Sequence, residues 1–275
     1  FSVQPYLVLI IILYLLVSVL GLVAGSFISA LSYRLPLGIK ITKGRSFCDN
    51  CGTKIAWYDN IPVFSYFLLD GKCRCCKKEI SLRYSLIEFS TLLVFLSIAY
   101  FYVSCVSTLG SAVCQWRNLL GSGALPYLLM LAAGFVTLAV IDLEHQMIPD
   151  KITLSLFAIT SLILIFLNPD YAYQSFLAGF LAALFLLLIH LATKGKGMGL
   201  GDVKLALLGG VILGWRSTVP WLMLSFIIGA VVGLILILFG KAKFGKHIPF
   251  GPFLVVSFFL ALVFGDRMFS SILRL

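Results

Sequence analysis

The chain contains few charged residues and very few acids. Of its 275 residues, 12% are Asp, Glu, Lys or Arg, and 11 are acidic. Hydrophobic residues make up 61% of the chain, and the mean hydropathy is +1.07. This composition excludes an ordinary soluble domain, because too few polar residues remain to cover a surface in water. We therefore expect a membrane protein almost throughout.

Eight apolar segments are candidates for membrane spans, although several of them are short. A helix needs about 20 residues to cross a hydrocarbon layer of roughly 30 Å. The first segment lacks the basic flank and the small-residue cleavage site of a signal peptide, so we expect it to remain as an integral span. The fold class that we predict is an all-α polytopic membrane protein with about eight transmembrane helices. The segments are Tyr6–Ala24, Leu86–Val103, Leu125–Leu143, Ile152–Leu167, Ser175–Leu191, Val203–Gly214, Trp221–Phe239 and Phe250–Phe264.

The basic residues gather in alternate connections between these segments. The connections at 25–85, 144–151, 193–204 and 240–247 hold 17 of the 21 Lys and Arg residues. Basic loops stay in the cytoplasm, so these connections are predicted to be cytoplasmic and both termini to face outward. The formal net charge of +10 is then a signal of topology in a lipid bilayer, and no nucleic-acid partner is expected.

Five of the seven cysteines lie in the first long connection, between the first two predicted helices. They include two Cys-x-x-Cys pairs separated by 21 residues. Four thiolates in two such pairs make a closed tetrahedral zinc site, which is structural because no coordination position stays open for a reactive water. About fifty residues bury little core, so this small cytoplasmic domain needs such a metal. The expected ligands are Cys48, Cys51, Cys73 and Cys76.

The three other cysteines leave alternatives open. Cys75 lies inside the second pair and could replace Cys73 or Cys76 as a ligand. Cys105 and Cys114 lie in a predicted outward loop, where they could form a disulfide or remain two free thiols.

Two acids lie at the ends of apolar segments. Asp142 closes the run 125–143, and Asp202 opens the stretch from 203 onward. A carboxylate near hydrocarbon needs a partner, water or a function. Both acids fall on the predicted cytoplasmic side, where they can meet and share a proton. Such a pair can activate water and polarise a peptide carbonyl. We therefore predict that Asp142 and Asp202 are the catalytic pair of an aspartic protease.

Two glycines come just before the second aspartate. We expect Gly199 and Gly201 to bind substrate by adopting positive φ, which lets an extended peptide approach the backbone and add β-like hydrogen bonds. Asp202 could instead only cap a helix. The segment Val203–Trp215 rises roughly 20 Å, too little to span. Either the glycine turn therefore dips below the surface beside a cavity, or the helix continues beyond Gly214.

Taken in order, these motifs resemble the type IV prepilin peptidases, the leader peptidase and N-methyltransferase family of GxGD membrane aspartic proteases. The resemblance covers nearly the whole chain. Besides the two cysteine pairs, it rests on Gly25-Ser26-Phe27, Arg34-Leu35-Pro36, Trp57-Tyr58-Asp59-Asn60-Ile61-Pro62, Gly71-Lys72-Cys73, Arg83-Tyr84 with Glu88, Ile141-Asp142 with Ile148-Pro149-Asp150, Gly199-Leu200-Gly201-Asp202 and Pro249-Phe250-Gly251-Pro252-Phe253.

The resemblance implies cleavage of type IV prepilins or pseudopilins after a glycine, at the cytoplasmic border of their apolar N-terminal helix. It also implies that many members then methylate the new N-terminus with S-adenosylmethionine. The implied location is the bacterial cytoplasmic (inner) membrane, with the active site facing the cytoplasm, in type IV pilus or type II secretion systems. The expected organisation is a first transmembrane helix (1–27), a cytoplasmic zinc-binding domain (28–85) and a transmembrane aspartic protease core (86–275).

Two other classes of function compete with this interpretation. A proton-coupled transporter also uses acids inside the membrane, but its acids usually lie near the midplane of repeated halves, and neither feature is apparent here. A non-catalytic, zinc-stabilised membrane assembly factor would leave both aspartates without a function. No dinucleotide-type glycine loop indicates a methyl-donor site, so methylation is expected from the resemblance alone.

Overall fold

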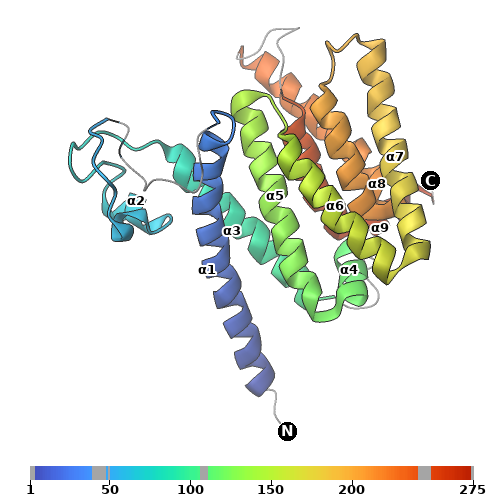
Figure 1. Cartoon of the computed structure of the whole chain (residues 1–275), viewed down its shortest axis with the longest axis horizontal. Coiled ribbons are helices and arrows are strands. Elements are labelled where there is room, and N and C mark those ends of the chain that lie inside the picture. Colours follow the sequence, from blue (N-terminus) through green and yellow to red (C-terminus); the bar gives the residue numbers. More distant parts are fainter. Residues whose placement is uncertain (1–3, 39–47, 49, 106–110, 241–248, 274–275) are drawn as a thin grey trace. The chain divides into compact units, whose positions relative to one another are not determined.

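The computed structural model describes residues 4–38, 48, 50–105, 111–240 and 249–273 (Figure 1). Within these ranges the chain forms helices and turns but no β-strand, and isolated bridge residues include the pair Lys72 and Glu79. The elements are α1 (Gln4–Arg34), η1 (Trp57–Asn60), α2 (Phe64–Leu68), α3 (Leu82–Val103), α4 (Ala112–Leu120), η2 (Gly121–Gly123), α5 (Ala124–His145), α6 (Asp150–Leu167), α7 (Pro169–Ala192), α8 (Leu200–Leu238) and α9 (Gly251–Ile272).

The predicted all-helical membrane fold is confirmed. Seven helices in the described ranges are long and apolar enough to cross a membrane, by length and composition. Large apolar side chains point outward on several of them, and Leu9, Phe166 and Leu238 are 66%, 79% and 75% exposed. Such a surface is costly in water but suits contact with lipid tails.

Two of the eight predicted segments lie within α8, because this helix reverses direction. Gly214 has φ 69° and ψ 178°, which is not helical. The Trp221 ring fills the space where a Cβ at Gly209 would lie. In a straight helix those two residues would be about 18 Å apart. Residues 215–238 therefore turn back alongside 200–213. The alternative of a helix that continues straight beyond Gly214 is wrong.

The first compact unit, Phe1–Tyr100, contains α1, η1, α2 and most of α3. A Cβ at Gly25 would lie 2.6 Å from the Cα of Glu88, so α1 and α3 touch backbone to backbone there. Residues 48–80 follow α1 and precede α3 in the chain, and they hold the two cysteine pairs. We call residues 48–80 the cysteine module.

The second compact unit, Phe101–Leu275, is a bundle of α4 to α9. A Cβ at Gly210 in α8 would lie 2.7 Å from the Cα of Gly179 in α7, so these helices also approach closely. The rings of Phe135 in α5 and Phe258 in α9 stack with centroids 3.9 Å apart. The α5–α6 and α7–α8 connections lie at the same end of this unit, the upper end in Figure 1. That arrangement brings the ends that carry the candidate aspartates together.

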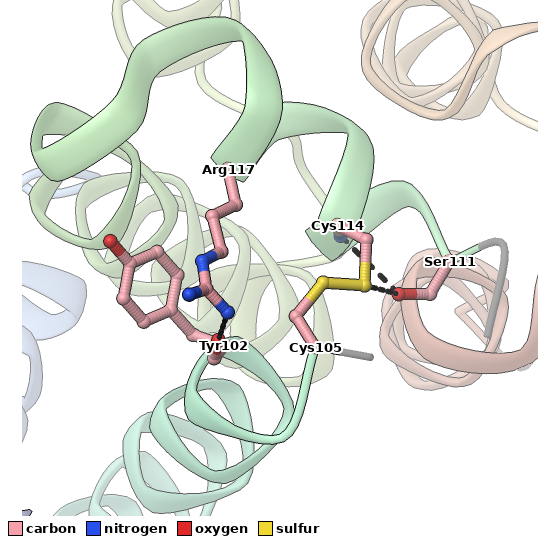
Figure 2. The surroundings of a disulfide bond; sticks show 5 residues. All are labelled: Tyr102, Cys105, Ser111, Cys114 and Arg117. Atoms are coloured by element: carbon pink, nitrogen blue, oxygen red, sulfur yellow. Dashed lines mark hydrogen bonds between the residues drawn. A yellow bond between two sulfur atoms is a disulfide. The ribbon is translucent and has the colours of Figure 1, made fainter. Parts of the chain in front are cut away.

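A disulfide joins Cys105 to Cys114 (Figure 2), which decides between the two alternatives left open above. Ser111 caps α4 by accepting the backbone N–H of Cys114 at 3.3 Å. Arg117 of the same helix donates a hydrogen bond to the carbonyl oxygen of Tyr102 at 2.8 Å. Helix α4 is thus tied to the end of α3 by a covalent bond near its start and by a charged hydrogen bond from its last turn.

Candidate active site

Asp142 lies in the last turn of α5 and is 6% exposed. Its Oδ2 accepts the backbone N–H of Gly251 at 3.0 Å. Gly251 is the first residue of α9, and a helix N-terminus presents free N–H groups and a positive dipole end that favour a carboxylate. Helix α5 ends shortly afterwards at Gln146, whose φ of 52° is left-handed. The chain therefore leaves the helix and changes direction shortly after Asp142.

Asp202 lies in the first turn of α8 and is also 6% exposed. Its Oδ2 accepts the backbone N–H of Gly199 at 3.1 Å. The N-cap residue is Gly199 and not Asp202, as the capping alternative would have it, but the Asp202 carboxylate stabilises the start of the helix from its third position. Capping occupies one oxygen and does not exclude a second role for the carboxyl group.

Both aspartates line one cavity of about 280 Å³. Its other walls are residues 146–148 after α5, the glycine-rich connection 195–201 and residues 249–250 before α9. The two carboxyl groups therefore border the same space. Two carboxyl groups beside one space for water form an arrangement that can share a proton and activate a water molecule.

Gly199 and Gly201 line the same cavity, but the expectation of positive φ is wrong for both. Gly199 has an extended backbone with φ −81°, and Gly201 lies inside the helical turn. A Cβ at Gly201 would lie 3.0 Å from the Cβ of Ile148. Close packing of α8 against the α5–α6 connection is therefore the local reason for glycine at this position.

His190, near the end of α7, holds the glycine-rich connection in place, and the sequence did not reveal this role. Its Nδ1 lies 2.7 Å from the carbonyl oxygen of Met198. A carbonyl oxygen only accepts, so this nitrogen must carry the proton. Thr193 adds a second contact by accepting the backbone N–H of Gly197 at 3.2 Å. His247 lies outside the described residues.

Asp150 also lies near this end of the bundle but does not line the cavity. It is the first residue of α6, and its carboxylate pairs with the Nζ of Lys204 at 2.6 Å. Its side chain is 57% exposed. This exposed ion pair bridges α6 and α8.

The four predicted zinc ligands come together in the cysteine module. The Sγ atoms of Cys48, Cys51, Cys73 and Cys76 all lie within 4.8 Å of one another. The Cys48 and Cys76 sulfurs are 3.8 Å apart. A tetrahedral zinc ion with Zn–S bonds of about 2.3 Å requires a sulfur separation of about 3.8 Å. The group therefore fits a zinc ion, and Cys75 lies outside it.

The two cysteine pairs have the same backbone geometry. In the first, Cys48 donates its N–H to the Thr53 carbonyl at 3.0 Å and accepts that of Gly52 at 2.8 Å. In the second, Cys73 bonds in the same way to Lys78 at 2.8 Å and Lys77 at 3.0 Å. Gly52 and Lys77 both have positive φ, 67° and 57°. Each pair is thus a tight turn that aims two sulfurs at a common point.

Two of the four thiols, those of Cys51 and Cys76, have a lowered pKa, whereas the pKa of Cys48 is raised. Hydrogen bonds from Thr53 lower the pKa of Cys51 to about 6. The backbone N–H of Lys78 lowers the pKa of Cys76. Thiolates are the metal-binding form of cysteine, so these contacts favour coordination near neutral pH.

Comparison with known proteins agrees with this geometry. Residues 19–102 match the Bacterial Peptidase A24 N-terminal domain, and residues 129–234 match the Type IV leader peptidase family. The chain is 32% identical to the "Prepilin leader peptidase/N-methyltransferase" of Pseudomonas putida, over 94% of this chain and 93% of that protein. The chain belongs to the type IV leader peptidase family. Proteins of the same name from Pseudomonas aeruginosa and Vibrio cholerae are each 31% identical, over 93% and 89% of this chain and 91% and 94% of theirs.

Each of the two matched regions of this leader peptidase family member contains one of the two sites. The N-terminal match contains the four-cysteine group, and the second match contains Asp142 and Asp202. Gly251 lies beyond the second match, so its contact with Asp142 comes from the structure and not from the family comparison. No solved structure matches the chain.

Proposed function

We propose that this chain cleaves the leader peptides of type IV prepilins or pseudopilins, with Asp142 and Asp202 as the catalytic pair. The observation that carries the proposal is the convergence of two buried aspartates, from α5 and α8, on one cavity. The name shared by the relatives, prepilin leader peptidase, supplies the substrate class. A transporter or a non-catalytic assembly factor accounts for neither the convergence nor the family membership.

The reaction is hydrolysis of one peptide bond by water. One aspartate is ionised and accepts a proton from the water, while the other is protonated and donates a hydrogen bond to the peptide carbonyl. Water oxygen adds to the carbonyl carbon, the C–N bond then breaks, and the leaving amine takes up a proton. The backbone N–H groups of Gly251 and Gly199 hold the two carboxyl groups in orientation throughout.

The glycine-rich connection is the proposed contact for the substrate backbone. Gly199 and Gly201 line the cavity and have no side chain to keep a peptide away from Asp202. The apolar helix of the prepilin would lie in the bilayer beside the bundle, and the scissile bond at its border would enter the cavity. Substrate binding thus needs only a short extended segment next to the aspartates.

We place this site at the cytoplasmic face of a bacterial inner membrane. The basic residues Lys151, Lys194, Lys196 and Lys204 lie in or next to the connections that line the cavity, as expected for cytoplasmic loops. The disulfide between Cys105 and Cys114 suits an oxidising outer compartment. We retain the division into a first transmembrane helix (1–27), a zinc-binding domain (28–85) and a protease core (86–275).

Two further parts of the proposal concern cofactors. We infer that Cys48, Cys51, Cys73 and Cys76 hold a structural zinc ion. The second half of the relatives' name indicates that the new N-terminus is methylated, for which the methyl donor would be S-adenosylmethionine.

The direct test is cleavage of a purified prepilin by the full chain in lipid nanodiscs. We expect hydrolysis of a single peptide bond after a glycine at the border of the apolar helix, identified by the masses of both products. A matched prepilin with that glycine replaced should remain uncut. An intact prepilin after incubation with folded, zinc-loaded protein would overturn the proposal, and proton flux into proteoliposomes would then favour the transporter.

Gly251→Ala is expected to slow this cleavage about 100-fold, because a displacement of about 1 Å at a reacting group can cost this much. A Cβ at Gly251 would lie 2.5 Å from Oδ2 and 3.0 Å from Cγ of Asp142, so the carboxyl group must move. The measurement is kcat in the prepilin assay. Gly233→Ala is the matched control, since a Cβ there meets no atom within 4 Å. A rate for Gly251→Ala equal to that of the control would show that Asp142 tolerates displacement.

A further inference from the structure

Helix α2, in the middle of the cysteine module, exposes a cluster of large apolar side chains. Phe64, Phe67 and Leu68 are 64%, 72% and 79% exposed. Their spacing of i, i+3 and i+4 places them on one face of the helix. We call these three residues the apolar tip. Three such side chains on a helix of five residues indicate a surface that contacts another apolar phase or molecule.

The other face of α2 is directed into the first compact unit. Ser65, Tyr66 and Leu69 line a cavity between α1, the start of α3 and the cysteine module, whereas the apolar tip does not line it. The Tyr66 ring also fills the space where a Cβ at Gly71 would lie. These inner contacts fix the orientation of α2, so the apolar tip faces away from the interior of the unit.

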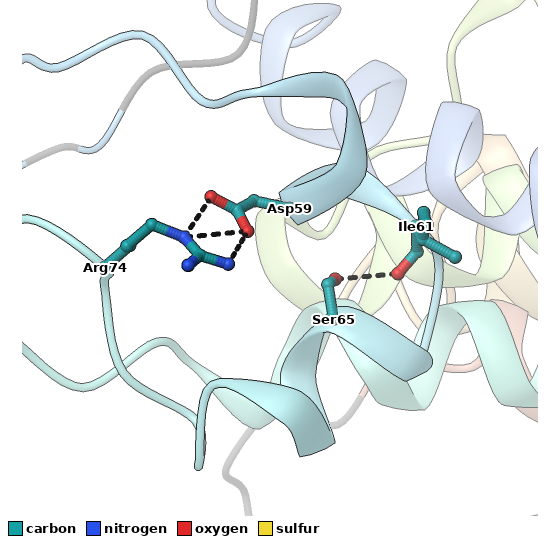
Figure 3. A network of polar contacts seen from close by, with 4 residues as sticks. All are labelled: Asp59, Ile61, Ser65 and Arg74. Carbon is teal, nitrogen blue, oxygen red and sulfur yellow. Dashed lines mark hydrogen bonds and ion pairs between the residues drawn. The ribbon is translucent and has the colours of Figure 1, made fainter.

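Polar contacts close the loop that carries α2 (Figure 3). Asp59, before the helix, accepts hydrogen bonds from the Nε of Arg74, after the helix, at 2.9 Å and from its Nη2 at 2.7 Å. The hydroxyl of Ser65 donates to the carbonyl oxygen of Ile61 at 2.7 Å, and the backbone N–H of Ser65 donates to the same oxygen at 3.1 Å. Polar groups at the start of α2 thus find partners within the loop, as a segment in a water-poor layer requires.

Contacts between α1 and α3 indicate the depth of this loop in the membrane. Near the ends of the two helices, the Nη2 of Arg83 donates to the Oγ of Ser32 at 2.8 Å. The backbone contact between Gly25 and Glu88 lies further along both helices. Gly25 is seven residues from Ser32, and Glu88 is five residues from Arg83, which correspond to about 10 Å and 8 Å of helix. The contact therefore lies that far inside the polar helix ends.

The cysteine module reaches the same level. The Oε2 of Glu88 accepts the backbone N–H of Val63, the residue before α2, at 2.8 Å. The polar layer on each side of a bilayer is roughly 5–8 Å thick. With Arg83 among the headgroups, Val63 therefore lies near the border of the hydrocarbon. At this level α3 already exposes Leu86 and Phe89, which are 64% and 50% exposed and suit contact with lipid tails.

We propose that the apolar tip inserts into the lipid bilayer, at the border between headgroups and hydrocarbon, and anchors the cysteine module there. The level of Val63, the direction of the tip and the lipid-facing side chains of α3 beside it all favour lipid as its neighbour. Residues 48–80 include five basic and four acidic residues, so attraction to charged headgroups contributes little. Burial of apolar side chains drives the insertion. The inference rests neither on the proposed hydrolysis nor on methylation.

The test measures the depth of a nitroxide at position 67 of the full chain in phosphatidylcholine nanodiscs. Phe67 is replaced by p-acetylphenylalanine, which keeps the ring and is labelled without using the cysteines. Collisions with oxygen, which concentrates in hydrocarbon, are compared with collisions with a water-soluble nickel chelate. We expect an oxygen-to-nickel ratio several-fold above that of a label at Lys77, an exposed residue of the same module. A label at Phe89, next to Glu88 on α3, is the matched reference and should give a ratio like that at Phe67.

Three results of this measurement would overturn the proposal. A ratio at Phe67 equal to that at Lys77 would place the apolar tip in water. Low accessibility to both reagents would place the tip against protein, and dipolar broadening of the spectrum would then identify a second copy of the chain. Protection from nickel that appears only when phosphatidylglycerol is added would show that headgroup charge, and not apolar burial, holds the module.

A substitution tests the insertion without a probe. Phe67→Asp places a carboxylate at the edge of the hydrocarbon, which expels it toward water, so limited proteolysis at residues 61–71 in nanodiscs should become about tenfold faster. Lys77→Asp is the matched control, because it puts the same side chain on an exposed position of the same module, and it should be cut like the unaltered chain. A zinc content equal to that of the unaltered chain would show that the module is folded in both variants. Equal rates of cutting in Phe67→Asp and in the unaltered chain would contradict the insertion.

Discussion

Asp142→Asn and Asp202→Asn are each expected to lower the rate of prepilin cleavage by about a thousandfold or more. An amide can neither take a proton from water nor give one to the peptide carbonyl, and removal of one member of a catalytic set often costs this much. Each Asn keeps an oxygen that can accept the N–H of Gly251 or Gly199. The fold should therefore survive, and the loss should appear in kcat with little change in KM.

The control for these variants is Glu144→Gln. Glu144 lies in the same last turn of α5 as Asp142, and its side chain undergoes the same chemical change, but it does not line the cavity. The Glu144→Gln variant should cleave prepilin at nearly the rate of the unaltered protein. Cleavage that persists in either aspartate variant, with the product masses unchanged, would end the two-aspartate mechanism. Equal loss in Glu144→Gln would point to general damage at the end of α5.

The sequence was sufficient to predict the helices and the two aspartates because their signals are local. A carboxylate at the end of an apolar run is visible without a structure, as Asp142 and Asp202 were. Their meeting could also be inferred, because two connections on the same side of a membrane end at the same level. The same holds for the cysteine pairs, whose spacing alone predicts a metal site.

Contacts between segments far apart in the sequence could not be predicted in this way. The bond from Gly251 to Asp142 joins residues 109 positions apart, and that from Val63 to Glu88 joins residues 25 apart. The sequence around these residues does not indicate which distant residue each of them will contact. The break after Gly214 was predicted, because the apolar segments Val203–Gly214 and Trp221–Phe239 are separate, and the structure adds the φ of 69° at Gly214. The choice between Cys75 and its neighbours likewise needed the positions of the sulfur atoms.

Replacing Cys51 and Cys76 together by Ser is expected to remove zinc from the protein and to unfold the cysteine module. Among residues 48–80 whose exposure the structure describes, Gly71 alone is buried, so hardly any apolar core holds this segment together. A structural zinc ion supplies about 10–16 kcal/mol of apparent binding free energy in small zinc peptides, and there binding and folding are one event. Without the metal, the conformational entropy of these residues is not offset.

The measurements are the zinc content per chain and limited proteolysis of residues 48–80. Zinc should fall from about one ion per chain to near zero, as four sulfurs around one point provide a single closed site. The segment should then be cut rapidly, while the bundle from α4 to α9 resists, because its core of stacked rings does not depend on the metal.

Cys75→Ser is the matched control and should retain zinc, since Cys75 lies outside the group. Loss of zinc in that control would bring Cys75 into the ligand set. An unaltered protein that holds no zinc yet resists cleavage at 48–80 would show that the module folds without a metal.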